Sequence, residues 1–131
     1  MHHGSCLCGA VKYEIDAPIE SATHCHCSQC RKAHGAAFGT YFTVRWSNFR
    51  WVQGEDVVAK FHSSPGVTRT FCQQCGSTLQ WYSQNAGPDC VGVALGTLDS
   101  ALGEIPQSHI YTDSKADWYV IADGLPQESR S

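Results

Sequence analysis

Hydrophobic and polar residues alternate along much of this chain with a period of two, which is the pattern of a half-buried β-strand. The clearest case is the segment AVKYEID, in which Val11, Tyr13 and Ile15 alternate with charged side chains. Similar segments lie at residues 36–44, 56–62, 67–71, 77–82, 90–98 and 108–112. Turn-forming sequences such as SSPG, NAGPD and DGLP separate several of these segments. The pattern therefore predicts a mainly β protein.

A helical pattern occurs only at residues 28–35, SQCRKAHG, where Ser28 is the expected N-cap. Twelve glycines and four tryptophans fit compact antiparallel sheets better than a helical bundle. The length of 131 residues suits one ordinary domain, and no repeat, linker or low-complexity segment divides the chain. We expect a single domain over residues 1–131, built from antiparallel sheets with at most short helices.

Charged residues make up only 16% of the chain, with 9 lysines and arginines against 12 acidic residues and a net charge of −3. This weak negative charge argues against binding to nucleic acid or to an anionic membrane surface. No segment approaches the ~20 apolar residues that a spanning helix needs, and the first residues lack the apolar region of a secretion signal. We therefore expect a cytoplasmic protein with no nucleic-acid partner and no membrane association.

The eight cysteines fall into three short groups and a singleton. The groups are a CxC, a CxCxxC and a CxxC, formed by Cys6 and Cys8, by Cys25, Cys27 and Cys30, and by Cys72 and Cys75. Structural disulfides belong to oxidising compartments, and bonds within such close pairs would close only tiny loops. Short cysteine arms that the fold brings together are instead typical of a metal site. The sequence favours metal binding, and the singleton Cys90 is expected to be a buried free thiol.

The spacing permits more than one division of the seven grouped cysteines. A structural zinc takes four protein ligands, whereas a catalytic zinc usually takes three and keeps one position open. The CxC and the CxxC together supply four ligands, which leaves the CxCxxC as an open set of three. The CxxCG turn supports the first set, because Gly76 can adopt a positive φ and direct backbone N–H groups at the thiolates. However, Cys27 and Cys30 form another CxxC that could join either pair.

A histidine could also close the set of three cysteines. The candidates are His24, His26, His34 and His62, since sites of three cysteines and one histidine are common. His26 alternates with Cys25 and Cys27, so in an extended segment its side chain should point away from theirs. We expect His26 to pack behind the cysteines rather than to join them.

Four ordered motifs give the chain a resemblance to a known family. They are GSCLCGAVKYEI, HCHCSQCRKAHGAAF, FCQQCGSTL and HIYTDSKADWY, and they run from residue 4 to residue 119. Together they resemble the glutathione-dependent formaldehyde-activating enzyme (GFA) family, in a compact form. The resemblance implies a small zinc-bound antiparallel β-sheet fold, similar to that of methionine-R-sulfoxide reductases.

The same resemblance implies the ligands and the reaction. It assigns a structural zinc to Cys6, Cys8, Cys72 and Cys75, and a catalytic zinc to Cys25, Cys27 and Cys30. Because three ligands hold zinc less tightly than four, we expect the second of these two Zn²⁺ sites to be partly occupied in a given preparation. It also implies a carbon–sulfur lyase with a small thiol such as glutathione and a small aldehyde such as formaldehyde as partners. The product is S-hydroxymethylglutathione.

Coordination chemistry is consistent with such a reaction at an open site. Three thiolates around Zn²⁺ carry a net charge of −1, so capture of a soft sulfur ligand is favoured over generation of hydroxide. Arg31 and Lys32 could meet the carboxylates of a glutathione-like thiol. The alternative is a non-enzymatic zinc-binding module for a protein partner or a small ligand, and an open coordination position distinguishes the two hypotheses.

Overall fold

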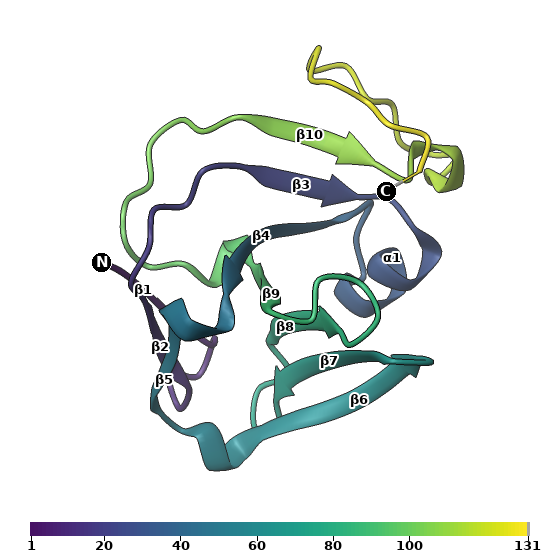
Figure 1. Cartoon of the computed structure of the whole chain (residues 1–131). Coiled ribbons are helices and arrows are strands. Elements are labelled where there is room, and N and C mark those ends of the chain that lie inside the picture. Colours follow the sequence, from purple (N-terminus) through teal and green to yellow (C-terminus); the bar gives the residue numbers. More distant parts are fainter. Residues whose placement is uncertain (131) are drawn as a thin grey trace.

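The computed structural model describes residues 1–130 and is built from two β-sheets with one short α-helix in this range (Figure 1). The strands are β1 His2–Ser5, β2 Lys12–Ile15, β3 Ala22–Cys25, β4 Gly39–Arg45, β5 Phe49–Gln53, β6 Val58–Ser64, β7 Val67–Cys72, β8 Thr78–Ser83, β9 Cys90–Ala94 and β10 Gln107–Ile110. The helix is α1 Ser28–His34, and short 3₁₀ turns are η1 Trp46–Asn48, η2 Glu55–Val57, η3 Leu95–Thr97 and η4 Thr112–Ser114. The prediction of a mainly β protein is confirmed.

The larger sheet has the strand order β10-β3-β4-β9-β8-β7-β6, and the smaller has the order β1-β2-β5. Every neighbouring pair is antiparallel except β3 and β10, which are parallel, with His24 opposite His109 and Cys25 opposite Ile110. The sequence pattern predicts no such parallel pair, because β3 and β10 are about 80 residues apart in the chain and are only four residues long. This pairing places the end of β10 beside the first cysteine of the CxCxxC.

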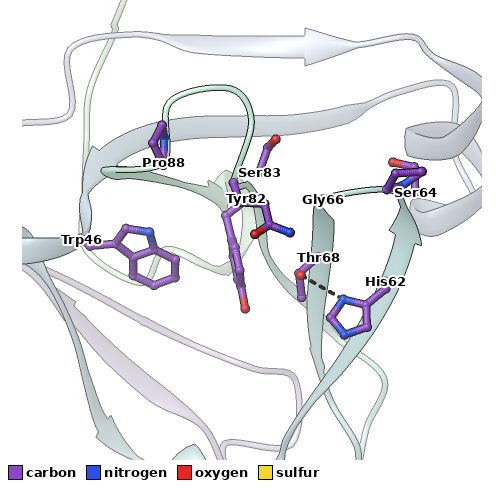
Figure 2. A pocket seen from close by; sticks show the side chains of 10 residues that line it. Trp46, His62, Ser64, Gly66, Thr68, Tyr82, Ser83 and Pro88 are labelled. Carbon is purple, nitrogen blue, oxygen red and sulfur yellow. Dashed lines mark hydrogen bonds between the residues drawn. The ribbon is translucent and has the colours of Figure 1, made fainter.

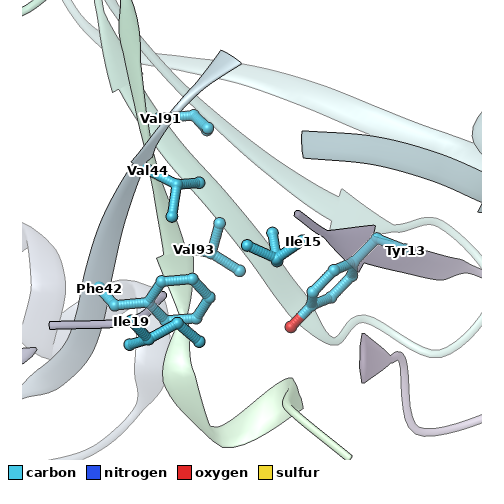
Figure 3. Close-up of a cluster of buried hydrophobic side chains, with 7 residues drawn as sticks. All are labelled: Tyr13, Ile15, Ile19, Phe42, Val44, Val91 and Val93. Carbon is cyan, nitrogen blue, oxygen red and sulfur yellow. The ribbon is translucent and has the colours of Figure 1, made fainter. Parts of the chain in front are cut away.

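The main hydrophobic core lies between the two sheets (Figure 3). Its members come from β2, β4 and β9, together with Ile19 from the loop after β2. They are Tyr13, Ile15, Ile19, Phe42, Val44, Val91 and Val93. Phe42 is 1% exposed and Val93 is fully buried, so these alternating positions fill the inner face as the period of two predicts.

The N-cap of helix α1 lies one residue before the predicted position. Cys27, not Ser28, is the N-cap, and its Sγ accepts a hydrogen bond from the backbone N–H of Cys30 at 3.3 Å. The prediction of Ser28 as cap is therefore wrong, because a thiolate or thiol sulfur can satisfy the same free N–H group that a serine oxygen would. Gly35 ends the helix with φ +60, and its N–H donates to the carbonyl oxygen of Arg31.

None of the helices within residues 1–130 is both long enough and apolar enough to cross a membrane.

Candidate metal centres

The first candidate centre joins the two sheets. Cys6 and Cys8 lie in the turn between β1 and β2, Cys72 is the last residue of β7, and Cys75 lies in the turn before β8. Their four Sγ atoms lie within 4.8 Å of one another. Gly76 has φ +80 in the second of these turns, as predicted for a CxxCG turn, and its N–H donates to the carbonyl oxygen of Cys72 at 2.7 Å.

The geometry of these four sulfurs fits a tetrahedral metal. Zinc–sulfur bonds of ~2.3 Å in a tetrahedron place neighbouring sulfurs roughly 3.8 Å apart. The Sγ atoms of Cys6 and Cys8 are 3.6 Å apart, and those of Cys8 and Cys72 are 3.8 Å apart. Disulfide sulfurs would lie near ~2.0 Å, and all eight cysteines are unpaired. The four-cysteine set is therefore suited to a metal ion rather than to two disulfides.

Neutral donors surround this set and favour its charged form. The backbone N–H of Val11 donates to Cys6 Sγ at 3.3 Å, and Ser77 Oγ lies 3.2 Å from Cys75 Sγ. The hydroxyl and backbone N–H of Ser77 lower the pKa of the Cys75 thiol to about 5. A deprotonated sulfur is the form that binds a metal.

The second candidate centre lies where β3 turns into α1. Cys25 ends β3, Cys27 caps the helix and Cys30 occupies its first turn, so one strand-to-helix turn brings the three sulfurs within 4.8 Å of one another. Cys25 and Cys30 are buried and Cys27 is half-buried. We call these three residues the cysteine trio. Within residues 1–130, the group that could hold this second metal contains no histidine and no carboxylate.

Hydrogen bonds within the trio distinguish its three thiols. Donation from the thiols of Cys25 and Cys30 lowers the pKa of the Cys27 thiol to about 2, and the N–H groups of Cys30 and Gln29 act in the same direction. The hydrogen bonds of Cys25 with Cys27 and Cys30 raise the pKa of the Cys25 thiol, and its burial raises this pKa further. These hydrogen bonds favour the thiolate form of Cys27 over that of Cys25.

The histidines proposed as possible fourth ligands have other partners. Both ring nitrogens of His24 are 2.8 Å from polar side-chain atoms, Thr40 Oγ1 and Gln107 Oε1. His34 Nε2 lies 2.7 Å from the hydroxyl of Tyr41, and His62 Nδ1 lies 3.1 Å from Thr68 Oγ1.

His26 is fully buried and points away from the trio's sulfurs into an aromatic layer. Its ring packs against Phe38, His109 and Tyr119, and its Nε2 lies 2.8 Å from His109 Nδ1. His109 Nε2 in turn lies 2.8 Å from Asp123 Oδ2. Burial lowers the pKa of His26, so its ring is neutral near pH 7. This agrees with the predicted packing role behind the cysteines.

Arg69, a buried residue of β7 that faces the trio, was not predicted from the sequence. Arg69 is 7% exposed, and its Nη2 donates to Cys30 Sγ at 3.6 Å. Its Nη1 donates to the hydroxyl of Tyr41 at 3.4 Å and its Nε donates to Ser63 Oγ at 3.2 Å. The sequence indicates Arg31 and Lys32 as the basic residues near the trio. Lys32 is exposed, and Arg31 Nε donates to the carbonyl oxygen of His26 at 3.4 Å.

A cavity of about 810 Å³ lies beside strands β6, β7 and β8 (Figure 2). Thr68 and Tyr82 line it, whereas their neighbours Arg69 and Trp81 point to the trio's side, because side chains alternate along a strand. Trp46 and His62 complete its walls (Figure 2). The cavity is therefore separate from both cysteine centres.

Cys90 lies outside both centres. It begins β9 and is half-buried rather than fully buried, which corrects the expectation of a buried thiol. Its backbone N–H donates to the carbonyl oxygen of Gly87 at 3.0 Å, so Cys90 lies where the turn before β9 meets the strand.

Comparison with known proteins shows the family to which this chain belongs. The sequence model of the glutathione-dependent formaldehyde-activating enzymes matches residues 1–114. The chain belongs to this GFA family. Over 129 residues it is 28% identical to a protein of Schizosaccharomyces pombe named as an uncharacterized lyase, a match that covers 93% of this chain and 86% of that relative.

A solved structure shares the fold of this chain. A crystal structure of a Rhodobacter sphaeroides protein matches with a TM-score of 0.66 at 28% sequence identity. The match covers 80% of this chain and 98% of the other.

Proposed function

We propose that this GFA protein is a zinc-dependent carbon–sulfur lyase that acts on a thiol–aldehyde adduct. The candidate reaction joins glutathione and formaldehyde: a bond forms between the thiol sulfur and the carbonyl carbon, and the thiol proton ends on the former carbonyl oxygen. The product is S-hydroxymethylglutathione. Family membership and the lyase name of the yeast relative support this class of enzyme.

The two cysteine sets have different parts in this proposal. Cys6, Cys8, Cys72 and Cys75 hold a structural zinc that ties the β1–β2 turn to the β7–β8 turn. Cys25, Cys27 and Cys30 hold a second zinc with three ligands, which leaves one position for substrate. A zinc ion with three thiolate ligands supplies one piece of chemistry when bound, namely the capture of a thiol as its thiolate at neutral pH.

The residues around the trio prepare it for a sulfur substrate. Tyr41, Ala94, Trp81 and Ile110 pack against the cysteines and exclude water from one side. Cys27 is the least buried of the trio, so a substrate would reach the trio from its side. The single observation that carries the proposal is a set of three cysteine sulfurs with no fourth protein ligand in its group among residues 1–130.

The test is the rate of S-hydroxymethylglutathione formation by zinc-loaded protein, corrected for the spontaneous reaction. The wild type should exceed the background rate, and Cys27→Ser should remove that excess. Cys90→Ser is the matched control, because it removes a half-buried thiol outside both centres and should keep the wild-type rate. If the wild type gives no excess with glutathione or with other small thiols and aldehydes, the non-enzymatic zinc module replaces this proposal.

A further inference from the structure

Arg69 is a buried cation with no carboxylate partner in the described part of the chain. Within residues 1–130, the contacts between basic and acidic side chains are Arg50 with Glu14, His109 with Asp123, and Arg130 with Asp113. An arginine side chain stays protonated in proteins, so Arg69 carries its charge at 7% exposure. Burying a charge is costly unless an opposite charge compensates it. An anion next to Arg69 therefore stabilises this buried charge.

Only one of the three acceptors around Arg69 can provide that anion. Ser63 Oγ is a neutral hydroxyl, and the phenol of Tyr41, with an ordinary pKa of about 10, is neutral near pH 7 as well. The third acceptor, Cys30 Sγ, belongs to the cysteine trio, whose sulfurs are deprotonated when they hold a metal. The four-cysteine centre differs in this respect, since neutral groups of Val11 and Ser77 donate to it.

We propose that Arg69 is the counter-ion of the cysteine trio, and that it makes the trio selective for an anionic fourth ligand, a small thiolate, over a neutral one. The inference rests on the proposed function in taking the trio as a metal site. Three thiolates and a divalent metal carry a net charge of −1, which the guanidinium balances. A thiolate adds a further negative charge beside Arg69, and a neutral ligand does not.

The position of Arg69 is fixed by three strands. Its own strand is β7, Ser63 lies on β6 and Tyr41 lies on β4, so the guanidinium contacts hydroxyls from two other strands as well as the sulfur on α1. A guanidinium held by several hydrogen bonds loses little further freedom when a ligand arrives. Arg69 is therefore preorganised toward the trio before any substrate binds.

The first test measures metal affinity at the trio. Co²⁺ is titrated into reduced, metal-free full-length protein under anaerobic conditions, and cobalt–thiolate absorption is followed, with Cys27→Ser identifying the trio's part of the signal. Arg69→Met should weaken Co²⁺ binding at the trio by about 30-fold, as for loss of one partner of a buried ion pair, and leave the four-cysteine centre within about 3-fold. Arg50→Met removes the same charge at a 70% exposed side chain and should change neither affinity. Unchanged affinity at the trio in Arg69→Met would overturn the inference.

Conservative variants keep the test decisive if Arg69→Met does not fold. Arg69→Lys retains the charge and Arg69→Gln removes it at similar size. The Arg69→Lys protein should bind Co²⁺ at the trio about 10-fold more tightly than the Arg69→Gln protein. Equal affinities for the two variants would contradict it.

The second test measures ligand selectivity at the loaded trio. 2-Mercaptoethanol is the probe thiol, because it has no carboxylate that could itself bind Arg69, and imidazole is the neutral competitor. Arg69→Met should weaken thiol binding, read from the cobalt spectrum, by about 10-fold or more and imidazole binding by less than about 3-fold. Equal losses for both ligands would mean that Arg69 only shapes the site, against the inference.

The two proposals fail in different ways. If the wild-type spectrum does not respond to any thiol, the lyase proposal fails, while the Co²⁺ affinities still decide whether Arg69 is the trio's counter-ion. If the wild type takes up thiol and Arg69→Met does so equally well, the inference about Arg69 fails and the lyase proposal stands.

Discussion

Replacement of Cys75 by serine tests the four-cysteine centre, because this substitution removes one metal ligand and little else. Cys75 is half-buried, so the serine hydroxyl can reach water and leaves no unsatisfied polar group in the core. Structural zinc contributes roughly 10–16 kcal/mol of apparent binding free energy, compared with roughly 5–15 kcal/mol for the whole stability of a domain. If four thiolates share this contribution equally, the loss of one costs about 2.5–4 kcal/mol.

This free energy corresponds to a clear shift of the melting temperature. At about 4 °C per kcal/mol for a chain of this length, Cys75→Ser should lower Tm by about 10–16 °C. The assay is thermal unfolding of zinc-loaded protein followed by circular dichroism, with zinc content measured on the same sample. Cys90→Ser is the matched control, a half-buried cysteine outside both centres, and should shift Tm by only a few degrees.

A chelator provides an independent check of the same reasoning. Excess chelator should lower the Tm of the wild type and of Cys90→Ser more than that of Cys75→Ser, which has less bound zinc to lose. A Cys75→Ser protein with a full complement of zinc and an unchanged Tm would refute the assignment of this residue as a structural ligand.

Three further predictions concern the fold. Phe42→Ala should lower the free energy of unfolding, measured by urea titration, by about 3–5 kcal/mol. Phe61→Ala, at a 61% exposed position, should lower it by less than ~0.5 kcal/mol. Similar losses in the two variants would contradict the core assignment. Gly4→Ala should lower the free energy of unfolding by about 1–3 kcal/mol, because the added methyl group meets the buried ring of Tyr13. Gly96→Ala places its methyl group in open space and should leave stability unchanged. Equal stability of the two variants would count against this packing. The hydrogen bond from His109 lowers the pKa of Asp123, so its stabilising effect is present above the unfolded pKa of about 3.9 and disappears as pH falls through the lower folded value. The Tm difference between wild type and Asp123→Asn should therefore be largest near neutral pH and shrink below about pH 4, and a constant difference would exclude this role.

Local periodicity predicted most of the strands, because their pattern of alternation is complete within the segment itself. The segments that it missed are β1, β3 and β5, each only four or five residues long. β3 shows the physical reason: its sequence ATHC has little pattern of its own, and pairing with β10 and β4 defines it as a strand. Such pairing depends on residues far away in the chain and has no local signal.

The cysteines are readily found from sequence, and the residues around them are not. Chelating spacing is local, so the trio and the two pairs are recognisable in the sequence alone, and the fold brings the CxC together with the CxxC. Arg69 shares one face of its strand with Val67 and Phe71, and the sequence does not show what lies opposite that face. Its burial depends on the trio's helix α1 covering that face, which only the tertiary structure reveals.

X-ray absorption at the zinc edge tests the central claim most directly, since it counts the sulfur ligands of the bound metal. Four ligands at one centre and three at the other give seven sulfurs for two zinc ions, an average of 3.5 per ion in thiol-free buffer. Addition of glutathione should raise this average to about 4 as its sulfur fills the open position. The contradicting result is an average that glutathione leaves unchanged, because it would mean that the second zinc has no position for a thiol.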